Sequence, residues 1–494
     1  MKRRQVIQQI GMGMAGGWLL PSLFTQCTPN DPGPEINYAG SVAIIGAGAA
    51  GLYAADILRS KGIKVTIYEA GTQIGGRVKS LRNQPVTAYP NIPLMSSDFP
   101  LELGADTFIG TDSILGKIVQ DYRLATTEFP ASANHYVIDN TAYSATDWGG
   151  DPDFAAAMAF RQNLKSLAGS SQSVQQEIVA AGISTRAHSL LNGTIGNLYG
   201  ADNDLAGAGA LGEAETLRTG DGKVLVLTGN PLQELLISRF NGVLPSVKLG
   251  TPITSIQYGA DPVVLTAQDG STFEANKVIV TVPVSILKNG GITFSPGLPG
   301  THTGSLAKIG MGASFRAIIE FKRNFWGESV GFIFGSTNVP EFMSMGLNRS
   351  VFNATLQVTV NGAKAATYSS LGDGAIDALL ADLDLLYNDK APNPVGYGTK
   401  YVRRKVDPVT LAETDPIYVM EDWTVREHIL GGYSYPLPGA TNDDRKNIGQ
   451  PINGKLFFAG EATDITGNSG MVNGALASAE RVAEEVVKSI LEPA

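Results

Sequence analysis

The chain has 494 residues, more than a single hydrophobic core usually organises, and this length predicts two domains. It carries 46 acidic and 37 basic residues, for a formal net charge of -9, which argues against nucleic acid or an anionic membrane surface as a partner. Its four histidines are scattered, so the sequence offers no Cys/His spacing typical of a metal site.

The N-terminal segment, residues 1–27, is predicted to be an export signal. Lys2-Arg3-Arg4 precede an uncharged stretch whose apolar core, Ile10 to Phe24, is too short for a membrane-spanning helix. The Arg3-Arg4 pair resembles a twin-arginine signal, a route that exports a folded chain with its cofactor already inserted. An ordinary export signal is the alternative.

The single cysteine, Cys27, directly follows this apolar core and directly precedes a stiff polar tether over residues 28–37. That arrangement resembles a bacterial lipoprotein, in which the cysteine carries the lipid, although Gln26 stands where a small residue is usual. We therefore expect an exported protein, either periplasmic or a membrane-anchored lipoprotein whose membrane contact is the lipid on Cys27. One cysteine allows no intrachain disulfide.

After the tether, the sequence predicts a dinucleotide-binding turn. An apolar strand over residues 42–45 runs into three glycines, which permit a tight turn, a close approach of backbone N–H groups to a pyrophosphate, and packing of the next helix on the strand. A second strand over residues 65–68 ends at Glu69, whose carboxylate can accept hydrogen bonds from a ribose. The alternative is a purely structural turn. The predicted phosphate-binding residues are Gly46, Ala47, Gly48, Ala49, Ala50 and Gly51.

The sequence that follows Glu69 favours FAD over NAD. A Gly-Gly-Arg ending at Arg77 places a fixed cation and bare backbone beside the phosphates, which suits a permanently held FAD and is not needed for NAD. Near the C-terminus, a buried strand over residues 456–458 leads to Glu461, and residues 469–475 open a helix. The positive end of that helix would face the N1–C2=O edge of a flavin, where negative charge collects on reduction.

With these motifs in order, roughly residues 40–490 resemble the flavin-dependent amine oxidases, the family of monoamine, polyamine and L-amino-acid oxidases. Glu102 to Asp106 is similar to the family segment that passes the flavin ring. Thr251 to Ile256 is similar to the strand whose backbone meets the adenine. Beyond the glycine turn, the residues that the resemblance assigns to FAD are Glu69, Ala70, Gly76, Arg77, Gly104, Ala105, Ile253, Gly460, Glu461, Met471, Val472 and Ala475.

The resemblance implies an α/β fold, with a Rossmann-like FAD-binding domain of the glutathione-reductase type and an intertwined α+β substrate-binding domain. The FAD-binding domain is expected from residues 38–108, 220–300 and 440–494. The substrate-binding domain is expected from residues 109–219, predicted to be helical, and from residues 301–439. The second insertion begins with Ser314 to Phe321, predicted to be a strand of mixed burial.

In this family a hydride passes from the carbon bearing the amine to flavin N5, and oxygen usually reoxidises the flavin, with a cation holding a water near N5. That cation is a lysine in most relatives, on a strand that precedes a Phe-Trp pair. Here the pair is Phe325-Trp326 and the matching residue is Arg316, which does not readily lose its proton. Three interpretations remain for Arg316: altered oxygen reactivity, a different electron acceptor such as a quinone, or a structural ion pair.

Many relatives flank the substrate amine with two aromatic residues. The segment from Trp423 to Tyr433 matches the one that supplies the first at Tyr433, and the second falls on Met471, which gives no flat wall. The resemblance thus places Arg316, Trp423, Tyr433 and Met471 at the catalytic site, with core packing as the alternative for Tyr433 and Met471. Gly432 replaces the cysteine of the covalent-flavin branch, so FAD is expected to be noncovalent.

The sequence therefore predicts an FAD-dependent oxidoreductase that oxidises a small-molecule amine or amino acid, with oxygen or an unidentified compound as electron acceptor. Two alternatives remain. One is a flavin-dependent desaturase or dehydrogenase of another apolar substrate on the same fold, and the other is a noncatalytic exported flavin-binding protein. Flavin bleaching by an amine or an amino acid discriminates the predicted enzyme from both.

Overall fold

The computed structural model describes residues 35–81, 89–388 and 396–492. The predicted export signal, Cys27 and the tether up to residue 34 lie outside the described residues. None of the described helices combines the length and the apolar character needed to cross a membrane.

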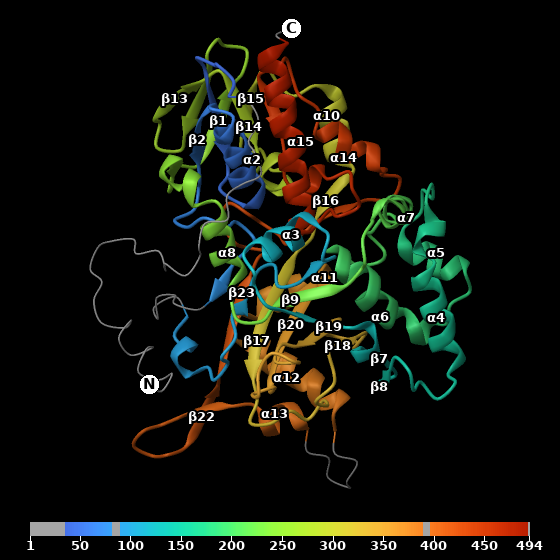
Figure 1. Ribbon diagram of the computed structural model, residues 1–494. Coiled ribbons are helices and arrows are strands. Elements are labelled where there is room, and N and C mark those ends of the chain that lie inside the picture. Colours follow the sequence, from blue (N-terminus) through green and yellow to red (C-terminus); the bar gives the residue numbers. More distant parts are fainter. Residues whose placement is uncertain (1–34, 82–88, 389–395, 493–494) are drawn as a thin grey trace. The chain divides into compact units, whose positions relative to one another are not determined.

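A five-stranded parallel sheet carries the glycine turn (Figure 1). Its strands, in spatial order, are β10 (Val247–Lys248), β2 (Lys64–Tyr68), β1 (Ser41–Ile45), β14 (Lys277–Val280) and β25 (Leu456–Phe458). Side chains alternate across β1, so Val42 and Ile44 pack against helices α2 (Ala49–Ser60) and α15 (Val472–Leu491). Ala43 and Ile45 face the opposite side.

A four-stranded sheet covers that opposite side, through the hydrophobic cluster that includes Ala43 and Ile45. Its strands, in spatial order, are β13 (Thr272–Ala275), β12 (Val263–Ala267), β11 (Ile253–Gln257) and β15 (Thr293–Ser295). Because both faces of the parallel sheet are covered, its strands β1, β14 and β25 are largely continuous apolar runs rather than alternating ones.

A seven-stranded sheet forms the second layered body. Its strands, in spatial order, are β23 (Tyr418–Asp422), β17 (Ser314–Glu320), β20 (Thr355–Asn361), β19 (Glu341–Ser344), β18 (Phe332–Phe334), β7 (His135–Ile138) and β8 (Thr141–Ser144). Only the β18/β7 pair is parallel among these described pairs. Helices α11 (Ala363–Leu371) and α12 (Ala375–Leu386) pack on one face.

The expected mixed burial of Ser314 to Phe321 is wrong. Every residue of β17 is buried. The reason is that β17 lies inside the sheet, between β20 and β23, so neither of its edges meets solvent. Its odd-numbered side chains face α11 and α12, and the even-numbered ones include Arg316.

Residues 109–219 were expected to be helical, but they also contain strands. They contain β6 (Thr126–Glu128), β7 and β8, and the last two extend the seven-stranded sheet. β6 pairs with β9 (Val224–Leu227), which also pairs with β5 (Phe108–Ile109). The helices of this segment are α3 (Ile114–Asp121), α4 (Pro152–Gln162), α5 (Val174–Ala180), α6 (His188–Leu191) and α7 (Ala208–Leu217).

The remaining described elements connect these layers. Three two-stranded pairs are β3 (Ser80–Leu81) with β4 (Leu101–Glu102), β16 (Ile309–Met311) with β24 (Ser434–Pro436), and β21 (Arg404–Val406) with β22 (Glu413–Pro416). The helices are α8 (Leu232–Arg239), α9 (Val284–Lys288), α10 (Gly300–Ala307), α13 (Tyr397–Tyr401) and α14 (Asn442–Ile448).

This architecture confirms the predicted fold class. The chain forms a parallel sheet, covered by helices on one face and a second sheet on the other, and a mostly antiparallel sheet with its own helices. The strands of the two large sheets alternate along the chain, so the two bodies are intertwined. The predicted domain limits themselves stay a prediction.

Candidate active site

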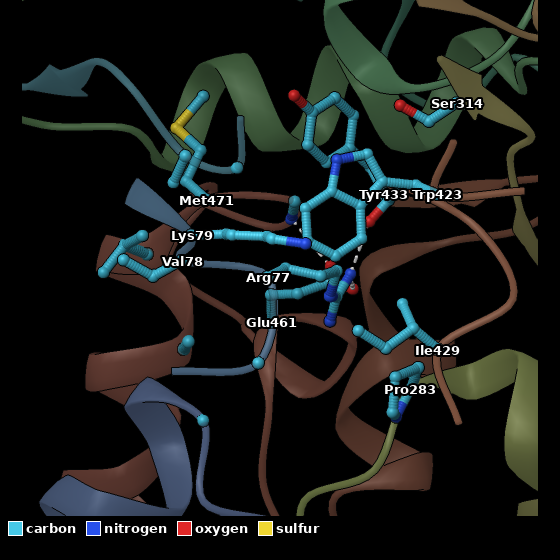
Figure 2. Close-up of a pocket in the computed structure, with 18 of the residues that line it drawn as sticks. Arg77, Val78, Lys79, Pro283, Ser314, Trp423, Ile429, Tyr433, Glu461 and Met471 are labelled. Carbon is cyan, nitrogen blue, oxygen red and sulfur yellow. Dashed lines mark hydrogen bonds and ion pairs between the residues drawn. The ribbon is translucent and has the colours of Figure 1, made fainter. Parts of the chain in front are cut away.

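One cavity of about 1550 Å³ runs from the glycine turn after β1 to the seven-stranded sheet. Figure 2 shows part of its wall, where side chains from several distant chain segments gather. The labelled residues are Arg77, Val78, Lys79, Pro283, Ser314, Trp423, Ile429, Tyr433, Glu461 and Met471. All of them line the cavity.

The glycine turn leaves backbone N–H groups free at the start of α2. Gly46 adopts a φ of +109°, which a side chain would strain. Gly48 is the N-cap residue of α2, and no side chain caps this helix end. The unpaired N–H groups and the positive helix end therefore face the cavity, an arrangement that binds a pyrophosphate.

Gly51, in the first turn of α2, packs against the glycine turn. A Cβ atom there would lie 2.0 Å from the carbonyl oxygen of Gly46, so only glycine lets α2 pack this closely on the turn. Ala47 also lies behind the wall: its N–H donates to Glu69 Oε2 at 2.7 Å, and its carbonyl accepts from the N–H of Gly75 at 2.9 Å. Ala47 and Gly51 therefore shape the cradle without lining the cavity.

Glu69 stands at the end of β2, where its carboxylate is held by backbone donors. Oε2 accepts the N–H of Ala47 at 2.7 Å and Oε1 accepts the N–H of Gly71 at 2.8 Å. A carboxylate oxygen can accept further hydrogen bonds, so the fixed side chain keeps capacity for ribose hydroxyls. Ile253, at the start of β11, lines the cavity near this end, with Thr251 bonded to the Glu69 carbonyl at 2.8 Å.

An ion pair between Arg77 and Glu461 links an N-terminal and a C-terminal segment of the cavity wall. Arg77 Nη1 lies 2.9 Å from Glu461 Oε1 and donates to the carbonyl of Gly432 at 2.7 Å. Glu461 also accepts from Ser434 Oγ at 2.6 Å and from the N–H of Gly470 at 2.8 Å. Burial alone would raise the pKa of Glu461, but the cations Arg77 and Arg445 outweigh it and hold that pKa below its ordinary value.

The residues present fit FAD. The cavity is continuous from the uncapped end of α2 past Glu69 to the start of α15, where Met471 is the N-cap and again no side chain caps the helix. FAD-assigned residues that line this cavity are Gly46, Gly48, Ala49, Ala50, Glu69, Ala70, Gly76, Arg77, Gly104, Ala105, Ile253, Gly460, Glu461, Met471, Val472 and Ala475. The two uncapped helix ends, of α2 and α15, open onto one dinucleotide-sized space, which suits a pyrophosphate and an electron-rich ring.

Arg316 is buried and lines this space. Its Nη1 lies 3.3 Å from Asp106 Oδ2 and also contacts the carbonyl of Gly104, and its Nη2 donates to the hydroxyl of Tyr433 at 3.2 Å. Burial works to lower the pKa of Arg316, but the surrounding acidic groups, Asp106 first, together outweigh it and hold that pKa above its ordinary value. Arg316 is therefore a fixed positive charge next to Tyr433.

Trp423 and Tyr433 line the same part of the cavity as Arg316. The indole N–H of Trp423 donates to the carbonyl of Leu103 at 2.8 Å, which fixes the ring. Burial raises the pKa of Tyr433, with Arg316 opposing, so its hydroxyl is neutral over the physiological range. Met471, the N-cap residue of α15, lines the same cavity. The structure therefore brings all four residues assigned to catalysis to one cavity.

Gly432 leaves no room for a side chain. A Cβ atom there would lie 2.5 Å from the Cβ of Ser314, and the carbonyl of Gly432 already accepts from Arg77. A cysteine at this position would require Ser314 or the local backbone to shift. This crowding supports the expectation that FAD is held without a covalent bond to this residue.

A family model described as "Flavin containing amine oxidoreductase" matches residues 49–487. The chain belongs to this family. Among curated proteins, it is 25% identical to polyamine oxidase 4 of Oryza sativa subsp. japonica, over 96% of this chain and 92% of that protein. It is 26% identical to human lysine-specific histone demethylase 2, over 87% of this chain, and it spans about half (51%) of that longer protein.

Solved structures give the same fold. A putrescine oxidase bound to putrescine superposes with a TM-score of 0.70 at 19% identity, over 91% of this chain and 99% of that one. Cyclohexylamine oxidase from Brevibacterium oxydans IH-35A is 18% identical and superposes with a TM-score of 0.70, over 92% of this chain and 100% of that one. At such identities the likeness shows the fold alone. With the family match, it identifies an FAD-dependent amine oxidoreductase.

Several polar residues of this flavin-containing amine oxidoreductase were missed by the sequence analysis. Lys79 Nζ lies 2.5 Å from Glu421 Oε2 and 5.9 Å from the centre of the Trp423 ring. Burial lowers the pKa of Lys79, and Glu421 opposes it only in part. The only feature of the sequence that pointed to Lys79 was its position two residues after Arg77, directly behind a motif assigned to FAD.

Glu341 had no sequence signal at all. It lines the cavity from β19, is only 6% exposed, and accepts from Asn197 Nδ2 at 3.2 Å. Burial raises its pKa to about 7, with Asp106 adding to the shift and Arg316 opposing it. Asp106 stood inside a segment assigned to the flavin, but its ion pair with Arg316 joins residues 210 positions apart and could not be read from either segment.

Proposed function

We propose that the enzyme oxidises a primary or secondary amine, rather than an amino acid, and passes the electrons to oxygen. FAD, when bound, supplies the hydride acceptor. The observation that carries the proposal is the charge arrangement at the Arg316 end of the cavity. Arg77 and Arg316 each have a carboxylate partner, and the carboxyl groups of Asp106, Glu341 and Glu421 line the same wall.

A substrate carboxylate would meet three acidic side chains there. The cations around them, Arg77, Arg316, Arg426 and Lys79, are already paired with carboxylates. An amine meets acceptors for its N–H groups instead, and it can lie against the rings of Trp423 and Tyr433. Arg316 keeps Tyr433 in place through the 3.2 Å hydrogen bond to its hydroxyl. Trp423 is held by its own hydrogen bond to Leu103, so the two rings can hold the reacting carbon in one orientation.

Anaerobic mixing of the purified yellow protein with separate panels of amines and amino acids tests this substrate class. Bleaching of the flavin absorbance by amines alone supports the proposal. Bleaching by amino acids alone would overturn the choice of amine, and bleaching by neither would favour the desaturase or noncatalytic alternatives.

The acceptor is tested in the second half-reaction. After anaerobic reduction, addition of oxygen should restore the flavin absorbance and yield hydrogen peroxide. Recovery with a quinone or a redox dye but not with oxygen would instead show that Arg316, in the lysine position of the family, accompanies a different acceptor. Acid precipitation should release the yellow colour into the supernatant, because we also propose noncovalent FAD; flavin in the pellet would contradict it.

We further propose that the protein is exported and, through Cys27, anchored by a lipid. The support is the sequence of residues 1–37 alone, with Arg3-Arg4 before an apolar core and Cys27 after it. Cell fractionation should find the mature protein outside the cytoplasm. A Cys27→Ser variant should become freely soluble, since one or more acyl chains would be lost. Equal distribution of the variant and the native protein would remove the lipid anchor and leave export intact.

A further inference from the structure

A single row of side chains crosses the seven-stranded sheet at right angles to its strands. Strand register places Glu421 beside Arg316, Arg316 beside Thr359, and Thr359 beside Glu341. Directly paired residues of neighbouring strands point to the same face of a sheet. The four polar side chains therefore stand in line on one face.

The row continues with aromatic residues. Glu341 pairs with Phe334, and Phe334 pairs with Tyr136 across the parallel β18/β7 step. Phe332, two residues along the same strand, stacks on Phe334 with ring centres 5.3 Å apart, and Phe129 meets Phe332 edge-on at 5.5 Å. This end of the row is an aromatic wall.

All six members of the row line the one cavity that also holds the FAD cradle: Glu421, Arg316, Thr359, Glu341, Phe334 and Tyr136. The row is therefore a floor that begins next to Trp423 and Tyr433 and leads away from them. Neighbouring strands lie about 4.8 Å apart, so Glu341 stands about 10 Å from Arg316 along the floor, and Phe334 about 14 Å.

We propose that this row selects elongated amines that carry an apolar, preferably aromatic, end group and an internal N–H group between that end and the reacting amine. The inference rests on the proposed amine oxidation and adds the shape and order of groups in the substrate. The reacting amine lies beside Arg316 and Tyr433, the internal N–H group lies over Glu341, and the aromatic end lies against Phe334 and Tyr136.

The internal N–H follows from the middle of the row. A plain methylene chain laid across Glu341 would close over a carboxyl group that is already nearly buried without giving it a further hydrogen-bond donor, which is costly. Asn197 supplies one donor, at 3.2 Å, and the Thr359 hydroxyl on the neighbouring strand can supply another, but the two carboxyl oxygens have about four acceptor positions. A substrate donor at this point satisfies the remaining capacity.

The experiment compares phenyl-terminated primary amines with methylene chains of increasing length, starting at benzylamine. The rate constant for anaerobic flavin reduction divided by the apparent dissociation constant should rise with chain length until the phenyl group reaches Phe334, by about 10- to 100-fold over benzylamine. A further gain of about tenfold is expected when one internal methylene is replaced by a secondary amine or an amide N–H. A series in which benzylamine is best would overturn the proposal.

A matched pair of variants tests the position of the end group. Phe334→Ala should reduce the preference for the long phenyl amine over benzylamine by at least about tenfold. Phe342→Ala removes the same ring from the opposite face of the same sheet, where Phe342 packs with the α11 and α12 cluster, and should leave the preference unchanged. If Phe342→Ala does not fold, Ile333→Val on that same face is the milder control. An unchanged preference in Phe334→Ala would overturn the proposal.

Glu341→Gln tests the middle of the row. It should reduce the gain from an internal secondary amine, which is charged, more than the gain from an internal amide. Binding of the corresponding trimethylammonium compounds to the holoenzyme, measured by titration calorimetry, keeps this test separate from turnover, because these compounds have no amine lone pair to drive oxidation. If no amine bleaches the flavin, the proposed function fails. A chain-length dependence of that binding still supports the row, and its absence overturns it.

Discussion

Replacing Glu461 by glutamine removes a buried charge without changing the size of the side chain. Glu461 is 5% exposed and accepts hydrogen bonds from Arg77, Ser434 and Gly470. In the Glu461→Gln variant, the amide nitrogen points a donor at another donor, and Arg77 loses its anionic partner. Breaking a buried ion pair by removing one partner costs about 3–5 kcal/mol. Because the Arg77 side chain is 25% exposed, we expect the lower end, about 3 kcal/mol.

The assay is urea unfolding of the holoenzyme at a fixed concentration of FAD. Because Glu461 lines the cofactor cavity, the dissociation constant for FAD is measured for each variant and the stabilisation by bound FAD is subtracted. The matched control is Glu413→Gln, which breaks the Lys322–Glu413 pair, whose side chains are 43% and 48% exposed. A surface pair of this kind contributes about 0–1 kcal/mol. Equal losses of unfolding free energy in Glu461→Gln and Glu413→Gln would refute the reasoning.

The pH dependence of the same measurement gives a second check. The pKa of Glu461 in the folded protein lies below its ordinary value, so its carboxylate stabilises the fold fully above the ordinary pKa, and this stabilisation is lost as the pH falls through the folded pKa. The difference between native protein and Glu461→Gln should therefore shrink in acid. A difference that stays constant from neutral pH to acid would mean that the charge of Glu461 is not what the variant removes.

Three further predictions concern Gly51 in the glycine turn and the two cations Arg316 and Lys79. Gly51→Ala should weaken FAD binding more than tenfold, because its Cβ would lie 2.0 Å from the carbonyl oxygen of Gly46. The control Gly304→Ala has no atom within 4 Å of the new Cβ and should stabilise the protein by about 0.5–1 kcal/mol. Equal FAD retention in the two variants would contradict this. Arg316→Lys should change flavin reoxidation by oxygen more than reduction by substrate in stopped-flow measurements, since only lysine exchanges its proton readily, and equal effects would place Arg316 outside the reoxidation step. Lys79→Met should alter the pH profile of flavin reduction. Lys277→Met should leave the profile unchanged: burial also lowers the pKa of Lys277, but this lysine does not line the cavity.

The cofactor half of the site was predictable from sequence because its geometry is local. The turn at Gly46 to Gly51 is closed by residues only a few positions apart, and Glu69 follows one strand later, so spacing alone predicts their roles. Glu461 lies far along the chain, yet a glycine before it and a helix after it identified its motif. In each case the residue types needed by the ligand stand next to one another in the chain.

The substrate half was predictable only where a single position could be matched to the family, as at Arg316 and Tyr433. Its other members depend on strand register, which sets Glu341 beside Thr359 and Thr359 beside Arg316. A shift of one residue in any of these pairings would turn the side chain to the opposite face. No local pattern in the sequence records that choice, so the polar middle of the cavity emerged only from the fold.

The pairing of Arg316 with Asp106 also decides how its variants must be interpreted. Removing Arg316 alone leaves the carboxylate of Asp106 buried without its cation, so a slow Arg316→Ala enzyme would combine the loss of a guanidinium with a misplaced negative charge. Asp106→Asn in the Arg316→Ala background removes that charge. If the double variant recovers the rate of reoxidation, the harm came from Asp106, and Arg316 serves mainly as its counter-ion. If the double variant stays slow, the guanidinium itself is required, and the structural ion-pair interpretation of Arg316 is eliminated.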